Sequence, residues 1–123
     1  MTKILIIEDD NDFRQMLHLT LKHNGYDVIE AADGQKGVEL YYEEKPDLVI
    51  TDIFMPGKEG VETVIELRES NPNIKIIAIS GAVTHSKLNF LSEMQDIGVQ
   101  KVFEKPFKSE DFLAGIKELL ETA

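Results

Sequence analysis

The sequence predicts an α/β protein with a doubly wound parallel sheet, in which five strands alternate with five helices. Short apolar runs and helical patterns follow one another five times along the 123 residues. The runs 4–7, 48–50 and 74–79 are almost entirely apolar, which is typical of strands buried on both faces. Strands that alternate with helices pair in parallel through right-handed connections. The pattern therefore predicts a (βα)5 fold.

The first strand, 4–7, leads into a helix that Asp10 or Asn11 can cap. The pair Asn24-Gly25 ends this helix. One helical stripe carries the residues expected to be buried: Phe13, Met16, Leu17, Thr20 and Leu21.

A weaker strand over 26–31 follows, interrupted by acidic residues, and leads to a helix from Gly34 to about Glu44 with Val38 and Tyr41 inward. The third helix begins after Gly60, where a turn-rich segment has broken the strand 48–50. Its expected buried stripe consists of Val61, Val64, Ile65 and Arg68.

The fourth helix is expected over 85–97, ending at Gly98, with Leu88, Leu91 and Met94 on its inner face. A short strand over 99–104 precedes a helix that starts at Ser109. The apolar side of that helix is Phe112, Leu113, Ile116, Leu119 and Leu120. Because the strands 26–31 and 99–104 are the more polar ones, they belong at the edges. This predicts the strand order 2-1-3-4-5.

Composition excludes several classes of function. The formal net charge is −10 and lysines are scattered, which argues against direct nucleic-acid binding. There are no cysteines, so thiolate catalysis and cysteine zinc sites are excluded. No apolar run approaches the roughly 18 residues that span a membrane, and the first residues lack the features of a secretory signal. We expect a cytoplasmic protein without membrane contacts.

Polar residues follow the ends of four of the five strands. Because the carboxyl ends of parallel strands share one edge of a sheet, Glu8, Asp9, Asp52, Ser80 and Lys105 are expected there together. Converging carboxylates repel one another unless a cation joins them, and an all-oxygen donor set favours Mg²⁺. A carboxylate nucleophile, an ammonium and a hydroxyl are groups that phosphoryl transfer needs.

Four motifs together resemble the signature of bacterial two-component response-regulator receiver domains. The motifs are Glu8-Asp9, Asp52 in the segment DIFMPGKEG, Ser80-Gly81 and Lys105-Pro106-Phe107. They occur in order, each at an expected strand end, and the match covers essentially the whole chain as a single receiver domain over 1–123. The resemblance implies the flavodoxin-like form of the doubly wound sheet.

The resemblance also implies a role for each acidic residue. Asp52 would accept a phosphoryl group from a sensor histidine kinase or a histidine phosphotransfer protein. Glu8 and Asp9 would hold Mg²⁺ together with Asp52, assisted by the backbone carbonyl of Phe54. Ser80 and Lys105 would contact the phosphoryl group.

The peptide bond before Pro106 would be cis, which is inexpensive only for X–Pro bonds. At the switch position, three residues before the lysine, the family usually has an aromatic residue, and this chain has Val102. Phe103 follows it and faces the other side of the strand. The loop after Ser80 is expected to be extended. Neither Phe54 nor Ala82, the two positions that tend to tune dephosphorylation in the family, can orient a water molecule.

The predicted function is phosphorylation-dependent signalling through a surface made by the helix 85–97, the strand 99–104 and the helix that starts at Ser109. The chain ends just after that helix, so we expect it to act on a separate downstream protein, which the sequence does not identify, unless the chain is a piece excised from a longer regulator. It is not expected to be an enzyme beyond weak autophosphatase activity. The alternatives are a docking module with a vestigial site and a Mg²⁺-dependent aspartyl-phosphate phosphatase. The phosphatase is disfavoured because such enzymes place the nucleophile after the first strand.

Overall fold

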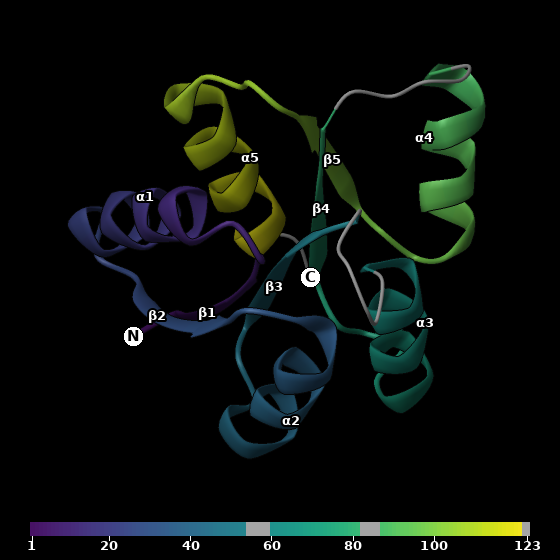
Figure 1. Ribbon diagram of the computed structural model, residues 1–123, viewed down its shortest axis with the longest axis horizontal. Helices are drawn as coiled ribbons and strands as arrows, with labels where there is room; N and C mark the ends of the chain where they lie inside the picture. Colours follow the sequence, from purple (N-terminus) through teal and green to yellow (C-terminus); the bar gives the residue numbers. More distant parts are fainter. Residues whose placement is uncertain (54–59, 82–86, 122–123) are drawn as a thin grey trace.

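The computed structural model describes residues 1–53, 60–81 and 87–121, in which strands and helices alternate along the chain (Figure 1). The strands are β1 (Lys3–Ile7), β2 (Asp27–Ala31), β3 (Leu48–Asp52), β4 (Ile76–Ser80) and β5 (Lys101–Glu104). The helices are α1 (Asn11–His23), α2 (Gly34–Glu44), α3 (Gly60–Ser70), α4 (Lys87–Asp96) and α5 (Ser109–Glu121).

The five strands form one parallel sheet in the order β2-β1-β3-β4-β5. The prediction of a doubly wound, flavodoxin-like α/β fold is therefore confirmed. All five residues of β3 and of β4 are buried, whereas β5 at the edge has none that is fully buried. The central strands are the ones with uninterrupted apolar runs, because both of their faces are covered by helices.

Helices cover both faces of the sheet. The first face carries α1 and α5, and the second carries α2, α3 and α4 (Figure 1). Each layer has its own apolar core against the sheet. Core residues of the first layer include Leu17, Leu21, Phe112, Ile116 and Leu119, and those of the second include Val38, Tyr41, Val64, Leu67, Phe90 and Met94.

The buried face of α3 differs from the expected stripe. Val64 is buried as expected, but Ile65 is 40% exposed, and the helix buries Thr63 and Leu67, which were not expected on this face. The helix also starts close to the sheet. A Cβ on Gly60 would lie 2.1 Å from the backbone oxygen of Asp52, so α3 starts directly against the end of β3.

Two other helices show smaller differences. In α1, Met16 was expected to be buried and is 39% exposed. In α4, Phe90 is buried although it was not expected on the inner face, whereas Met94 is buried as expected. Leu91 is half-buried, and the side chain of Leu88 lies outside the described residues.

Arg68 connects the end of α3 to the turn that follows α4. Its guanidinium donates to the carbonyl oxygens of Pro72 (2.7 Å) and Gly98. Gly98 has a φ of +97°, and a Cβ at this position would lie 2.5 Å from Arg68 Nε. Glycine is therefore required here both for the turn and for the arginine to reach the carbonyl.

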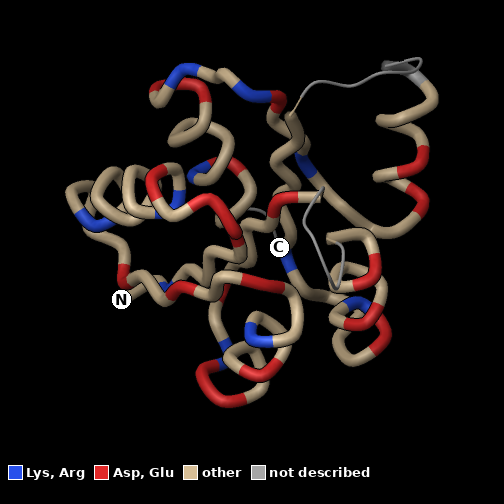
Figure 2. The backbone as a smooth tube through the Cα atoms, viewed as in Figure 1, with Lys and Arg blue, Asp and Glu red and all other residues tan. Residues whose placement is uncertain are grey.

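Basic residues are spread over several elements and do not gather on one face, whereas acidic residues occur throughout (Figure 2). Among the helices that the structure describes, none has both the length and the apolar character needed to cross a membrane.

Candidate functional site

Three carboxylates meet at the carboxyl edge of the sheet. Each of Glu8, Asp9 and Asp52 offers an oxygen atom, and these atoms lie within 4.8 Å of one another. Glu8 and Asp52 are 1% and 6% exposed, whereas Asp9 is exposed. The cluster therefore has two buried carboxylates and one that faces solvent.

Asp52 is placed by the end of β3. It is the last residue of the strand, and the next residue, Ile53, donates its N–H to the carbonyl oxygen of Ile79 in β4 (3.0 Å). Gly60 donates its N–H to Ile53 (3.1 Å), which brings the first turn of α3 against the backbone of Asp52. The position of the carboxylate is thus set by two neighbouring elements.

Glu8 and Asp9 lie between β1 and α1. The N–H of Glu8 donates to Ala31 at the end of β2 (3.0 Å). Asp10 then caps α1, because its carboxylate accepts from the N–H groups of Asp12 (3.0 Å) and Phe13 (3.1 Å). The acidic pair is therefore held in a short connection whose two ends are both hydrogen-bonded.

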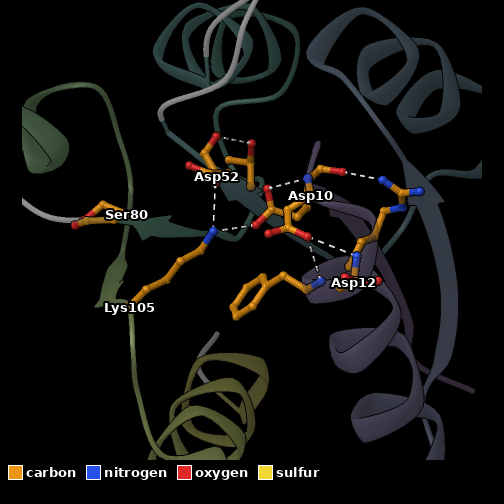
Figure 3. A network of polar contacts seen from close by, with 10 residues as sticks. Asp10, Asp12, Asp52, Ser80 and Lys105 are labelled. Atoms are coloured by element: carbon orange, nitrogen blue, oxygen red, sulfur yellow. Dashed lines mark hydrogen bonds and ion pairs between the residues drawn. The ribbon is translucent and has the colours of Figure 1, made fainter.

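Lys105 brings a positive charge into the cluster. Its Nζ lies 2.7 Å from Glu8 Oε1 and 3.1 Å from Asp52 Oδ2 (Figure 3). The same ammonium lies 4.2 Å from the centre of the Phe13 ring, which favours a cation. The backbone N–H of Lys105 donates to the carbonyl oxygen of Ser80 (2.7 Å), so β5 stays paired with β4 up to this residue.

The proton affinities of Glu8 and Lys105 both differ from their ordinary values. Burial raises the pKa of Glu8 from 4.5 to about 7; Lys105 opposes this rise, and the neighbouring Asp52 adds to it. Burial alone would lower the pKa of Lys105, but the hydrogen bonds and charges of Glu8 and Asp52 outweigh burial and raise it above 10.5. The ammonium therefore stays charged, and the cluster still carries excess negative charge that a proton or a cation can neutralise.

The donor set fits a hard divalent cation. The three carboxylates offer only oxygen atoms, and their mutual distances allow one ion to contact all of them. Small numbers of carboxylates completed by water are typical of Mg²⁺ sites. Glu8, Asp9 and Asp52 would hold such an ion.

Ser80 is not part of this cluster. It is buried at the end of β4, its hydroxyl donates to the carbonyl oxygen of Gly81 (3.2 Å), and it points away from Asp52 (Figure 3). Val102 packs against the core of the second layer and Phe103 against that of the first, so the two face opposite sides of β5.

The peptide bond between Lys105 and Pro106 is cis. Phe54, Ala82 and most of the loop after Gly81 lie outside the described residues. The predictions about the Phe54 carbonyl, about the two tuning positions and about the length of that loop therefore stay predictions.

Two residues near the site were missed by the sequence analysis. Phe13 is one wall of the site through its contact with Lys105, although its helical spacing indicated only a core position. Arg14 donates to the backbone oxygen of Glu8 (2.7 Å), a contact that leaves no signal in the sequence because its acceptor is a carbonyl group.

Comparison with known proteins gives a consistent result. The family model for the response regulator receiver domain matches residues 4–117. Sporulation initiation phosphotransferase F of Bacillus subtilis is 29% identical over 118 residues, covering 96% of this chain and 93% of the relative. Together, these two matches extend over nearly all of the chain.

Solved structures agree with this match. Chemotaxis protein CheY4 of Vibrio cholerae has a TM-score of 0.88 at 28% identity, covering 97% of this chain and 98% of its own. A CheY-like response regulator receiver domain protein of Methanospirillum hungatei has a TM-score of 0.90 at 28% identity, with coverages of 98% and 94%. The likeness therefore extends to the whole fold.

Proposed function

Since this chain belongs to the family of response regulator receiver domains, we propose that Asp52 is its phosphoacceptor. The donor is the phosphohistidine of a sensor histidine kinase or of a histidine phosphotransfer protein, and the reaction requires Mg²⁺. The protein is a phosphoacceptor in a two-component system rather than an enzyme that turns over a substrate.

The observation that carries this proposal is the buried carboxylate of Asp52, which lies 3.1 Å from the ammonium of Lys105 and shares one cluster with Glu8 and Asp9. A structural acidic residue at a strand end would not need two further carboxylates and a lysine that converge on it from other strands. A phosphoryl acceptor does need them, because phosphoryl transfer is promoted mainly by positioning and by charge.

In the proposed reaction, a carboxylate oxygen of Asp52 attacks the phosphorus atom. The phosphorus–nitrogen bond of the donor breaks, and its electron pair leaves with the imidazole nitrogen. Lys105 is placed to counter the charge of the phosphoryl oxygens. Mg²⁺, when bound, supplies further neutralisation of that charge.

The proposed signal then reaches a partner protein through the surface made by α4, β5 and α5. Ser80, at the end of β4, and Lys105, just after β5, are joined by a backbone hydrogen bond of 2.7 Å. If Ser80 or Lys105 moves to contact the phosphoryl group, the hydrogen bond between them would pass that movement to β4 and β5. Val102 lies in the middle of β5, packed against the core that includes Phe90 of α4.

The test is incubation of the protein with acetyl phosphate and Mg²⁺, followed by intact-mass measurement. Wild type should gain the mass of one phosphoryl group, and Asp52→Asn should gain none. Asp47→Asn is the matched control, because Asp47 lies just before the opposite end of the same strand, where it accepts from the N–H of Lys3 (2.9 Å). This variant should be phosphorylated like wild type.

The same experiment separates the alternatives. A docking module with a vestigial site would gain no phosphoryl group in any variant. A Mg²⁺-dependent phosphatase would release phosphate from simple esters with many turnovers. Phosphorylation that persists in Asp52→Asn would show that another residue is the acceptor.

A further inference from the structure

Arg14 makes three contacts that together hold the connection between β1 and α1. Its guanidinium donates to the backbone oxygen of Glu8 (2.7 Å), to the side-chain oxygen of Asn11 (2.7 Å) and to Glu30 Oε1 in β2 (3.0 Å). Its side chain is 17% exposed. The planar fork of an arginine can make all three contacts at once, which a lysine cannot.

The contact with Glu8 fixes the peptide group that joins the two acidic residues. The N–H of Glu8 is held by Ala31 (3.0 Å), and its carbonyl oxygen is held by Arg14. The orientation of the Glu8–Asp9 peptide plane determines where both side chains leave the backbone. Arg14 therefore influences the positions of two of the three carboxylates without touching either of them.

The charge of Arg14 argues against a direct role at a cation site. A guanidinium close to such a site would repel Mg²⁺. In this protein the guanidinium is paired with Glu30, whose other carboxylate oxygen lies 2.7 Å from His18 Nδ1. Glu30 thus offsets the charge of Arg14. The remaining effect of Arg14 on the site is to orient the backbone through its hydrogen bonds.

We propose that Arg14 is a positioning residue, which orients Glu8 and Asp9 for the divalent cation through the Glu8 carbonyl. This inference rests on the proposed function, because that function is the reason to expect Mg²⁺ at the site. The inference can still be tested separately, because binding of Mg²⁺ can be measured without any phosphoryl donor. Groups that orient metal ligands from outside typically affect metal affinity about 10- to 100-fold.

The experiment is isothermal titration of the full chain with MgCl₂, comparing wild type, Arg14→Ala and Arg14→Lys. A positioning role predicts that Arg14→Ala binds Mg²⁺ about tenfold more weakly, with Arg14→Lys between this variant and wild type. A role through charge alone predicts the opposite sign, because removal of a positive charge strengthens cation binding. Lys101→Ala is the matched control: it also removes one positive charge and one ion pair (Lys101 Nζ to Glu118, 3.0 Å), but on β5 and α5 away from the cluster.

A second measurement excludes a merely structural role. With acetyl phosphate as donor, Arg14→Ala should need more Mg²⁺ to reach half of its maximal rate, while the rate at saturating Mg²⁺ stays close to that of wild type. If circular dichroism shows that Arg14→Ala does not fold, the test uses Arg14→Lys alone, and the inference then predicts that this variant binds Mg²⁺ more weakly than wild type.

Equal or tighter Mg²⁺ binding in the folded Arg14 variants would overturn the inference, as would an equal loss in Lys101→Ala. These outcomes are distinct from a failure of the proposed function. If wild type binds Mg²⁺ but Asp52 is not phosphorylated, the proposed function fails while the role of Arg14 in ion binding can still be measured.

Discussion

The ammonium of Lys105 lies 2.7 Å from the carboxylate of Glu8, although 97 positions separate the two residues in the chain. This ion pair connects the end of the last strand, β5, to the end of the first strand, β1, across the site. It also places a positive charge beside the carboxylates that would hold a divalent cation, so the lysine and such an ion would compete for the same oxygen atoms.

We expect Lys105→Met to change ion affinity and stability in opposite directions. Without the ammonium, Glu8 and Asp52 lose a half-buried partner, so the ion-free protein should be less stable by about 1–3 kcal/mol. Because no positive charge then competes for their oxygen atoms, the carboxylates should bind Mg²⁺ more tightly. Urea unfolding in EDTA and calorimetric titration measure the two effects, with Lys101→Met as the control. Weaker Mg²⁺ binding in Lys105→Met would contradict the predicted competition.

The ion-free protein should become less stable as the pH rises toward about 7. The pKa of Glu8 is raised from 4.5 to about 7 in the folded protein, so between these values the folded state holds a proton that the unfolded state has released. Folding is then favoured at the lower pH, and this contribution is lost as the pH rises through the folded pKa. The measurement is the unfolding free energy in EDTA across this range, as wild type minus Glu8→Gln.

Glu44→Gln is the control for this pH series, because Glu44 is an exposed carboxylate paired with Lys3 (3.1 Å). The unfolding free energies of wild type and Glu44→Gln should differ little, because an exposed ion pair contributes little to stability. A flat difference between wild type and Glu8→Gln would show that Glu8 titrates normally.

Asp52→Asn should stabilise the ion-free protein and weaken its response to Mg²⁺. The substitution removes one of three carboxylates that repel one another, and it also removes a ligand for the ion. For wild type, Mg²⁺ at a hundred times its Kd should add about 2.7 kcal/mol to the unfolding free energy. Thermal unfolding with Mg²⁺ and with EDTA tests both parts. An equal gain from Mg²⁺ in both proteins would place the ion elsewhere.

Gly60→Ala should damage the site through the backbone. The added Cβ would lie 2.1 Å from the backbone oxygen of Asp52 and 2.5 Å from Ile53 Cα, and overpacking of this kind costs about 1–3 kcal/mol. Since the clash pushes on Asp52, phosphorylation by acetyl phosphate should also slow. Gly81→Ala is the comparison, because a Cβ there meets no atom within 4 Å. Equal stability of the two variants would show that α3 can move away without cost.

The phosphorylated protein should lose its phosphoryl group slowly. Neither Phe54 nor Ala82 has a group that can orient an attacking water molecule. Replacement of Phe54 by Asn should shorten the lifetime of the phosphoprotein, because an amide can orient a water molecule by hydrogen bonds and a phenyl ring cannot. Intact-mass measurement after removal of the donor follows the decay. A half-life of only seconds for wild type would refute this prediction.

The strand order and the location of the site could be predicted from the sequence. Unbroken apolar runs mark the central strands, and polar residues at the ends of parallel strands must meet at one edge. The rotation of α3 could not be predicted, because Ile65 and Leu67 are both apolar, and which of them is buried depends on how the helix packs against the sheet.

The orientation of Ser80 and the contacts of Arg14 were also beyond the sequence. A serine at a strand end can point toward or away from its neighbours, and the backbone oxygen of Gly81 accepts its hydroxyl here. Arg14 donates to the backbone carbonyl oxygen of Glu8. Because every residue has such a carbonyl group, the sequence does not indicate which one accepts. Such contacts depend on the folded path of the backbone rather than on residue type.

The link between Arg68 and Gly98 has a consequence for how α4 can respond. The helix begins beside the edge of the sheet that carries Asp52 and ends at the opposite edge, where the guanidinium of Arg68 holds the following turn. Because the same guanidinium also donates to the carbonyl oxygen of Pro72 after α3, the carboxyl end of α4 is tied to α3. A displacement of α4 that keeps this contact would therefore tilt the helix rather than slide it along the sheet.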